Sequence, residues 1–286
     1  MKSAIHYLAF IPIIFSLACN GPSIEETEYE GRPHFKINTS TATYYYDKAG
    51  GGLSRVMDAD GVDWVHYNGD PQASAPSGAS GGFRGIPNMV YRSDDGGAGH
   101  PGFDQCTSEL IDKKTIRSQS KSGNWQWTWV FFDDYAQLTV EKADPDHPYW
   151  FLYEGPVAGS FDPSRKYWGT DLGGPRYEVP SLNKGESILD HWQWAYFGDV
   201  DTHRIFFVLQ QEKDQLIDHF AYMGDTKEGN EAEDGMVVFG FGRDKGAKAL
   251  MTETGNVFKI GFLEKGVMSK EDHQWVSLQI ERIITR

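Results

Sequence analysis

Apolar and polar residues alternate along much of the chain, and this pattern predicts β-strands over most of its length. The clearest case begins at Trp125, where tryptophan recurs at every second position through Trp127 and Trp129, as expected for one face of a strand. Residues 149–153 (YWFLY) are apolar at every position, which is typical of a strand buried between two layers. Further strands are predicted at residues 41–46, 53–57, 63–67, 135–142, 192–197, 203–211, 236–241, 258–262 and 275–284.

Helical periodicity is weak by comparison. No stretch sustains apolar residues at a period of 3.6, and residues 216–222 are the best candidate for a short helix. About a dozen strands separated by Gly, Pro and Asp turns, with no internal linker, indicate an antiparallel β-sandwich. We therefore predict an all-β fold with few short helices, in a single domain that spans residues 33–286.

The N-terminal residues have the layout of an export signal. Lys2 precedes an apolar run at residues 7–17, which is too short to cross a membrane. The run ends in Ser-Leu-Ala before Cys19, and a small residue before cysteine resembles a bacterial lipoprotein cleavage site. This predicts a signal peptide at residues 1–18, a lipid on Cys19, and a tether at residues 19–32. The alternative is an ordinary signal peptide that is cleaved elsewhere. In the first case, the protein is periplasmic or attached to the outer membrane, and it contacts the membrane only through the lipid.

Charge and aromatic content narrow the class of ligand. The chain has 27 Lys and Arg against 41 Asp and Glu, a net charge of −14, so it lacks the basic stripe that nucleic-acid binding requires. An acidic protein can still bind an acidic sugar where a few cations gather in one cleft. Nine Trp and 14 Tyr favour sugar binding, because aromatic rings stack on the C–H face of pyranoses. We assign Trp125, Trp127 and Trp129 to the core, and we expect Trp168 and Trp192 to line a cleft.

Residues 41–67 carry a family resemblance. An aromatic strand is followed by GGGLSRVMDADGVDW, which reads as a glycine-rich turn, a strand, a D-x-D-G turn and another strand. This order resembles the opening of galactose-mutarotase-like β-supersandwich domains, which occur in sugar epimerases, polysaccharide lyases and glycoside hydrolases. FRGIPN, HPGFDQC and YWFLYEG are also similar to segments of exported bacterial proteins associated with polysaccharide breakdown. The resemblance implies a carbohydrate-active protein, although a fold alone does not determine a reaction.

Three segments concentrate residues that can do chemistry. Residues 81–106 contain seven glycines, which favours a long ordered loop of the kind that carries binding and catalytic groups. Residues 154–176 form a second Gly/Pro-rich segment, and residues 190–199 are rich in aromatic side chains. These segments supply Arg84, Asn88, His100, Asp104 and Cys106; Glu154, Lys166, Tyr167, Trp168 and Arg176; and His191, Trp192 and Tyr196.

Elimination on a uronic acid needs a cation on the carboxylate, a base for the C5 proton and an acid for the leaving oxygen. Arginine can bind a carboxylate through two parallel hydrogen bonds, and an imidazole titrates near neutral pH. We predict Arg84 and Arg176 as the carboxylate clamp, His100 and His191 as bases, and Tyr196 or Tyr167 as the acid. Contacts with the substrate are predicted from Asn88, Asp104, Lys166, Tyr167, Trp168, Arg176 and Trp192.

Other chemistries remain open. Hydrolysis needs two carboxylates, which Glu154 and one of Asp104, Asp171 and Asp190 could supply, and mutarotation could use His191 with Glu154. A non-catalytic surface glycan-binding lipoprotein is a further alternative. Motifs for a nucleophile elbow, a phosphate loop or a dinucleotide fingerprint are absent from the sequence.

No cofactor is expected. A metal site made of His100, Asp104 and Cys106 would have workable spacing but lacks a zinc signature, and an unpaired Cys106 is more typical of a small buried hydrophobe. The leading prediction is therefore an exported lyase or dehydratase that acts by β-elimination on uronate-containing poly- or oligosaccharides. Ulvan is the type of polymer that the resemblance suggests.

Overall fold

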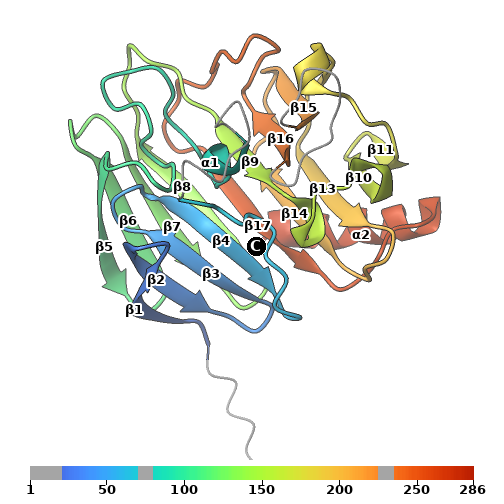
Figure 1. Ribbon diagram of the computed structural model, residues 1–286, viewed down its shortest axis with the longest axis horizontal. Helices are drawn as coiled ribbons and strands as arrows, with labels where there is room; N and C mark the ends of the chain where they lie inside the picture. Colours follow the sequence, from blue (N-terminus) through green and yellow to red (C-terminus); the bar gives the residue numbers. More distant parts are fainter. Residues whose placement is uncertain (1–20, 70–79, 225–234) are drawn as a thin grey trace, which may run out of the picture.

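The computed structural model describes residues 21–69, 80–224 and 235–286. Over these residues the chain forms mainly antiparallel β-strands with one long helix (Figure 1), which confirms the predicted all-β class. No helix in the described part is long and apolar enough to cross a membrane. The predicted signal peptide and Cys19 lie outside the described residues, so export and lipid attachment stay predictions from the sequence.

Two four-stranded sheets form one layer of the molecule. The first follows chain order, β1–β2–β3–β4, and the second has the order β12–β15–β16–β9. Backbone pairing of residues 85 and 86 joins them, because Ile86 pairs with Leu53 of β4 and Gly85 pairs with Glu154 of β9. The strands of this layer are β1 (Ser23–Tyr29), β2 (Arg32–Asn38), β3 (Ala42–Asp47), β4 (Gly52–Asp58), β9 (Phe151–Gly155), β12 (Ile188–Asp190), β15 (Asp218–Met223) and β16 (Met236–Phe241).

A nine-stranded antiparallel sheet forms the second layer. Its order is β11–β10–β13–β14–β17–β8–β7–β6–β5. The strands are β5 (Cys106–Asp112), β6 (Thr115–Ser120), β7 (Gln126–Phe131), β8 (Ala136–Lys142), β10 (Lys166–Thr170), β11 (Gly173–Arg176), β13 (Trp194–Asp199), β14 (Ile205–Gln210) and β17 (Val257–Leu263). Helical elements are α1 (Ser80–Phe83), α2 (Lys270–Ile284) and the 3₁₀ turns Val157–Gly159, Pro163–Arg165 and Leu182–Lys184.

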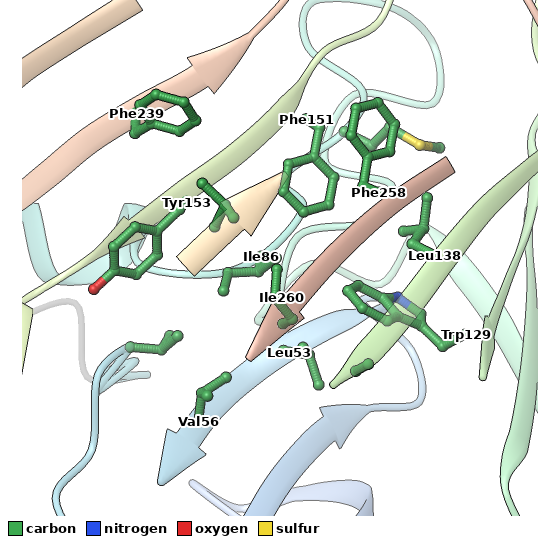
Figure 2. Packing of buried hydrophobic residues seen from close by; sticks show 14 of the residues in the cluster. Leu53, Val56, Ile86, Trp129, Leu138, Phe151, Tyr153, Phe239, Phe258 and Ile260 are labelled. Carbon is green, nitrogen blue, oxygen red and sulfur yellow. The ribbon is translucent and has the colours of Figure 1, made fainter. Parts of the chain in front are cut away.

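The main core lies between the two layers. Phe151 and Tyr153 of β9 point into it (Figure 2), and Phe151 stacks on Phe258 of β17 with ring centroids 4.5 Å apart. Leu152 and Glu154, at the intervening positions, do not belong to this cluster. The alternation of β9 therefore sends one set of side chains into the core and the other to the outer face of the layer.

The five tryptophans that were assigned either to the core or to a cleft are all buried in the core. Trp125, Trp127 and Trp129 are fully buried in the core, as predicted. Trp168 and Trp192 are also core residues, 1% and 0% exposed, so the expectation that they line a cleft is wrong. They lie against the other layer: Trp168 packs 4.5 Å from the ring of Phe220, and Trp192 stacks 5.7 Å from Phe239.

Helix α2 is a correction to the predicted strand at residues 275–284. Val276 and Ile280 are buried, whereas Leu278 between them is 54% exposed, which is the spacing of one helix face rather than of a strand. Ser269 and Asp272 form a capping box at the N-terminus. The helix covers the outer face of one end of the nine-stranded sheet (Figure 1), so β10, β13 and β14 are buried on both sides, whereas β5 at the other end is largely exposed.

Two further segments differ from the sequence-based interpretation. Residues 23–29, which were expected to belong to a tether, form strand β1 and pair with β2 along their full length, and Ile24 packs against the core. Residues 218–223, in the segment proposed as a short helix, form strand β15. Phe220 and Tyr222 alternate into the core there, so a period of two describes this segment better than a helical one.

Candidate functional site

A pocket of about 320 Å³ lies on the outer face of the layer that contains β9, within the size range of small-molecule sites. Its floor includes Leu152 and Glu154 of β9 and Val238 of β16, the residues that alternate away from the core. The glycine-rich loop at residues 81–106 contributes much of the wall. The lining includes Phe83, Asn88, Tyr91, Arg92, His100, Phe103, Trp150, Leu182, Met223 and Arg243.

Four polar side chains in the pocket are almost completely buried. Asn88, His100, Glu154 and Arg243 are between 4% and 8% exposed. The Asn88 amide nitrogen donates to Glu154 Oε2 and to the carbonyl of Phe83. This contact joins the loop to strand β9 and fixes the Asn88 side chain over the carboxyl group.

Several buried polar atoms around the pocket have no hydrogen-bond partner among the described residues. These atoms are Asn88 Oδ1, His100 Nε2 and, on Arg243, both Nε and Nη1. Buried polar groups in folded proteins are nearly always satisfied, and leaving one unsatisfied costs about 1–3 kcal/mol. These four atoms are therefore available to form hydrogen bonds with a polar ligand, and Arg243 could bind an anionic group of such a ligand.

Burial sets the protonation states of the pocket. It raises the pKa of Glu154 to about 7, against the opposing effects of the Arg243 charge and the Asn88 hydrogen bond. It lowers the pKa of His100 to about 4, because the charged imidazolium loses its hydration. Between these two values the pocket holds a protonated carboxyl group and a neutral imidazole. This combination provides a proton donor and a proton acceptor at the same pH.

The loop that carries Asn88 and His100 is ordered by its own backbone hydrogen bonds, as its glycine content predicts. Asn88 N donates to the Gly99 carbonyl and Val90 N donates to the Ala98 carbonyl, each at a distance of 3.0 Å. The tip between these pairs is held by buried Asp95, which accepts from Ser120 Oγ at 3.1 Å. The loop is therefore a hairpin whose tip is fixed to the nine-stranded sheet.

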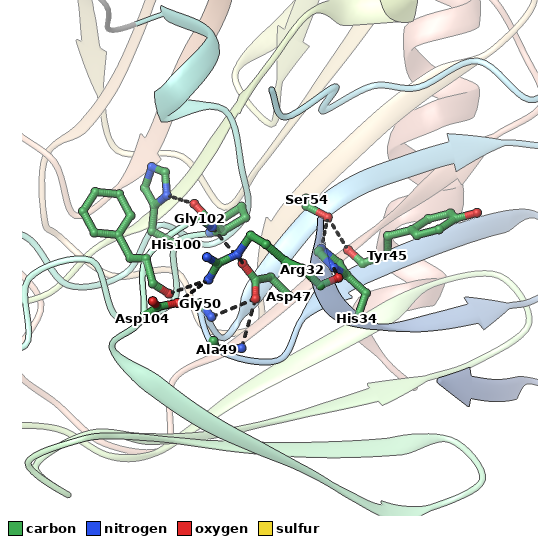
Figure 3. A network of polar contacts seen from close by, with 12 residues as sticks. Arg32, His34, Tyr45, Asp47, Ala49, Gly50, Ser54, His100, Gly102 and Asp104 are labelled. Atoms are coloured by element: carbon green, nitrogen blue, oxygen red, sulfur yellow. Dashed lines mark hydrogen bonds and ion pairs between the residues drawn. The ribbon is translucent and has the colours of Figure 1, made fainter. Parts of the chain in front are cut away.

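Asp47, at the end of β3, attaches the His100 end of this loop to the first sheet (Figure 3). One carboxylate oxygen accepts from the amides of residues 49 and 50, and the other accepts from Gly102 N at 2.8 Å and Arg32 Nε at 2.7 Å. The two backbones pass so closely that a Cβ on Gly50 would lie 2.4 Å from the His100 carbonyl oxygen. Asp47 thereby positions the turn that carries His100.

We expect Asp47→Ala to destabilise the fold strongly. Asp47 is fully buried, and its removal leaves one guanidinium and three amide donors without their acceptor, a loss of about 3–5 kcal/mol. The decrease in the free energy of unfolding is measured by urea denaturation. Asp134→Ala, which removes a half-exposed carboxylate that pairs with Arg286 at the surface, is the control and should change stability by less than about 1 kcal/mol. Equal effects of the two substitutions would contradict the positioning role.

The structure brings together only part of the predicted site. Asn88, His100 and Glu154 lie in one pocket, although nothing in the structure tests their predicted roles. Arg243 and Trp150 were missed. Arg243 directly follows Gly242 after a fully apolar strand, an abrupt change from apolar to charged that is the one signal the sequence offered.

Arg84, predicted to bind the substrate carboxylate, and Asp104, predicted to contact the substrate, instead form contacts within the protein. Arg84 is buried and donates to the backbone carbonyls of His66 and Gly235, at distances of 3.1 and 2.9 Å. These bonds hold the start of the loop against two other segments of the chain. Asp104 is exposed and pairs with Arg32 at 2.7 Å. The alternative metal site of His100, Asp104 and Cys106 is not formed, since no group of three or more metal-ligating side chains occurs among the described residues. Cys106 is buried.

The remaining predicted residues lie away from the pocket, which corrects the expectation of a single shared cavity. Tyr196 contacts His273 of α2, and the Tyr167 hydroxyl accepts from Val267 N, so both face the helix on the far side of the nine-stranded sheet. His191 Nδ1 contacts the Leu216 carbonyl at 2.7 Å. Three others have structural roles: buried Lys166 pairs with Asp199, Arg176 pairs with Glu178 and covers Trp168, and Trp192 packs in the core.

Comparison with known proteins identifies the fold. Neither a protein-family model nor a curated protein sequence matches the chain. Among solved structures, a putative aldose 1-epimerase from Klebsiella pneumoniae is 11% identical with a TM-score of 0.51, covering 91% of this chain and 87% of that one. A galactose mutarotase-like protein from Lactobacillus casei is 11% identical with a TM-score of 0.50, covering 80% and 100%. The fold is a galactose mutarotase-like β-sandwich. This confirms the fold that residues 41–67 suggested, and at such identity it shows the fold alone.

Proposed function

We propose that the protein is a carbohydrate-active enzyme that binds a uronic acid unit in this pocket and cleaves its C4–O bond by β-elimination. The observation that carries the proposal is Arg243, a buried guanidinium with two unpartnered nitrogens beside a carboxyl group and an imidazole in opposite protonation states. A carboxylate is the ligand that best satisfies a desolvated guanidinium. The galactose mutarotase-like fold, which is found in sugar-processing proteins, is consistent with a sugar as the carrier of that carboxylate.

Each polar residue of the pocket has a part in this reaction. Arg243 binds the C6 carboxylate and stabilises the negative charge that develops when C5 loses its proton. His100 Nε2 accepts the C5 proton, and the electrons of the C5–H bond form the C4=C5 double bond as the C4–O bond breaks. Glu154 donates its proton to the departing oxygen. Asn88 holds Glu154 in place through its amide nitrogen, and exchange with water restores both protonation states.

We expect activity to show a bell-shaped dependence on pH. The base must be neutral, which holds above the His100 pKa of about 4, and the acid must be protonated, which holds below the Glu154 pKa of about 7. The kcat/KM for a uronate oligosaccharide should therefore be highest between these values and fall on both sides. A rate that keeps rising through pH 8 would contradict the assignment of Glu154 as the acid.

Mutarotation is a second candidate, because the pocket holds one carboxyl group and one imidazole. The sequence-based pair of Glu154 and His191 would be replaced by Glu154 and His100. Hydrolysis has less support: among the described residues that line the pocket, Glu154 is the only carboxylate, whereas hydrolysis uses two. The proposed pairing of Glu154 with Asp104, Asp171 or Asp190 would need one of those residues in the pocket, and they do not line it.

Product analysis distinguishes these reactions. The protein is incubated with a panel of uronate-containing oligosaccharides, and the ultraviolet absorbance of the conjugated C4=C5 alkene is followed together with product mass. Elimination gives a rising absorbance and an unsaturated product. New reducing ends without absorbance would indicate hydrolysis, and faster interconversion of anomers in proton NMR would indicate mutarotation. Binding without any reaction would indicate a glycan-binding protein.

A further inference from the structure

A second arginine lies at the mouth of the pocket. Arg92 is exposed and lines the pocket, and its guanidinium carbon is 4.8 Å from the centroid of the Tyr91 ring. Arg92 has a φ of 55°, a left-handed conformation that non-glycine residues rarely adopt and that occurs often at functional sites. No carboxylate of residues 21–69, 80–224 or 235–286 forms an ion pair with Arg92. In a chain with a net charge of −14, an arginine without an acidic partner at a pocket mouth is available to an external anion.

Two aromatic rings connect Arg92 with Arg243. Tyr91 stacks on Trp150 with centroids 5.1 Å apart and planes 23° apart, and the Arg243 guanidinium lies 5.6 Å from the Trp150 ring. Trp150 is 4% exposed and donates through Nε1 to the Asn88 carbonyl at 2.6 Å, whereas Tyr91 is 37% exposed. The four side chains therefore form a series from the buried Arg243, through the buried ring of Trp150 and the half-exposed ring of Tyr91, to the exposed Arg92.

The segment that presents Tyr91 and Arg92 is held in place. The buried Asp95 carboxylate accepts from Ser120 Oγ and from Ser122 N, at 3.1 and 3.2 Å. Gly97 N donates to the Val90 carbonyl at 3.0 Å, which closes the tip from the other side. A ligand that binds Arg92 therefore does not have to order this segment first, which reduces the entropic cost of binding.

From this arrangement we infer that Tyr91 and Arg92 form a second subsite, which binds the sugar next to the uronate and selects a neighbour that carries its own anionic group. The inference rests on the proposed function, because it places the first uronate on Arg243. Arg92 binds the sulfate ester or carboxylate of the second sugar, and the ring of that sugar packs against the exposed edge of Tyr91, because Trp150 and Arg92 lie over the ring itself. The preferred substrate is thus a polyanionic oligosaccharide rather than one with an isolated uronate.

The test compares the affinities of three uronate disaccharides by calorimetry. In all three the uronate is the same, and the neighbouring sugar is neutral, sulfated or itself a uronate. Binding is measured to full-length protein that carries Glu154→Gln, so that turnover is too slow to disturb the binding measurement. Each disaccharide is also measured with Arg92→Ala added, and with Arg282→Ala added as the matched control, since Arg282 is an exposed arginine on α2. Free glucuronate tests the Arg243 site separately.

We expect a disaccharide with a second anion to bind about threefold to fivefold more tightly than the neutral one, the size of an exposed ion pair. The better of the sulfated and carboxylated probes identifies the anion. The preference should disappear with Arg92→Ala, persist with Arg282→Ala, and weaken as salt is added. Equal binding of all three disaccharides, or a preference that survives Arg92→Ala, would overturn the second subsite while free glucuronate binding leaves the proposed function standing. Failure of every probe, free glucuronate included, would overturn both.

Discussion

Replacing Glu154 with glutamine is expected to reduce kcat on a uronate oligosaccharide by about 10²–10⁴-fold, because the amide cannot protonate the departing oxygen. Glutamine keeps the size of the side chain and an oxygen that can accept from Asn88, so the pocket should keep its shape. Measured kcat with unchanged circular dichroism checks this. Glu141→Gln, which alters a carboxylate on β8 in the other layer, should leave kcat unchanged. Full activity of Glu154→Gln would exclude Glu154 as the acid.

The same substitution should stabilise the protein at neutral and higher pH. The folded-state pKa of Glu154 is raised from 4.5 to about 7, so the folded state holds a proton that the unfolded state has lost in this interval. Stability is therefore lost as pH rises from about 4.5 to 7, and glutamine avoids that loss. We expect a gain on the order of 2–3 kcal/mol above pH 7 and none near pH 4. A gain that is the same at every pH would contradict the raised pKa.

Changing Arg243 to lysine is expected to reduce kcat/KM by about 10²–10³-fold, although the positive charge is kept. A lysine ammonium cannot offer the two parallel N–H groups that bind a carboxylate in plane, and the loss corresponds to about 3–4 kcal/mol of transition-state stabilisation. Steady-state kinetics on the same oligosaccharide measure it.

The control for Arg243 is the neutral analogue of the substrate. A disaccharide whose C6 carboxylate is reduced to an alcohol should bind wild type and Arg243→Lys equally weakly, because the group that distinguishes them is absent. If Arg243→Lys retains wild-type kcat/KM on the uronate, the carboxylate does not bind at Arg243. A preference for the neutral analogue in the wild-type protein would lead to the same conclusion.

The sequence predicts the parts of the site that lie in loops better than those on strands. The glycine content of residues 81–106 indicates an ordered loop with polar groups, and this loop does bring Asn88 and His100 to the pocket. The fold class also follows from alternation, since the period of two is a local property that needs no knowledge of which strands are neighbours. Of the predicted opening segment, the aromatic strand and the strand after the glycine-rich turn are confirmed as the paired β3 and β4, whereas the strand predicted at residues 63–67 is wrong, because only Asp63 pairs there, in an isolated bridge with Met57.

The failures have one main physical cause. Val276, Leu278 and Ile280 alternate with polar residues like a short strand, so the sequence pattern concealed helix α2. Without that helix, the outer face of β10 and β13 would be open and Tyr167 and Tyr196 would be available to a ligand. With it, both faces of those strands are covered, and alternation alone cannot tell which face of a doubly buried strand belongs to a site.

Arg243 was missed for a different reason. It lies beside Glu154 because β16 pairs with β9, with Val238 opposite Glu154. This pairing joins segments far apart in the chain, and the hydrophobic pattern of each strand is compatible with many partners. Local patterns therefore identify Glu154 and His100 as candidates but do not indicate which cation accompanies them.

The proposed elimination requires a uronate carboxylate to bind Arg243 with C5 facing His100, and a crystal structure of Glu154→Gln with a bound uronate disaccharide tests this directly. We predict the carboxylate oxygens at about 2.7–3.1 Å from Arg243 Nη1 and Nη2, the two N–H groups at the end of the guanidinium that can donate in parallel, with the C5 hydrogen directed at His100 Nε2. A disaccharide bound with its carboxylate in solvent, or at the open surface groove beside Arg176 and Lys245, would contradict the proposed binding mode.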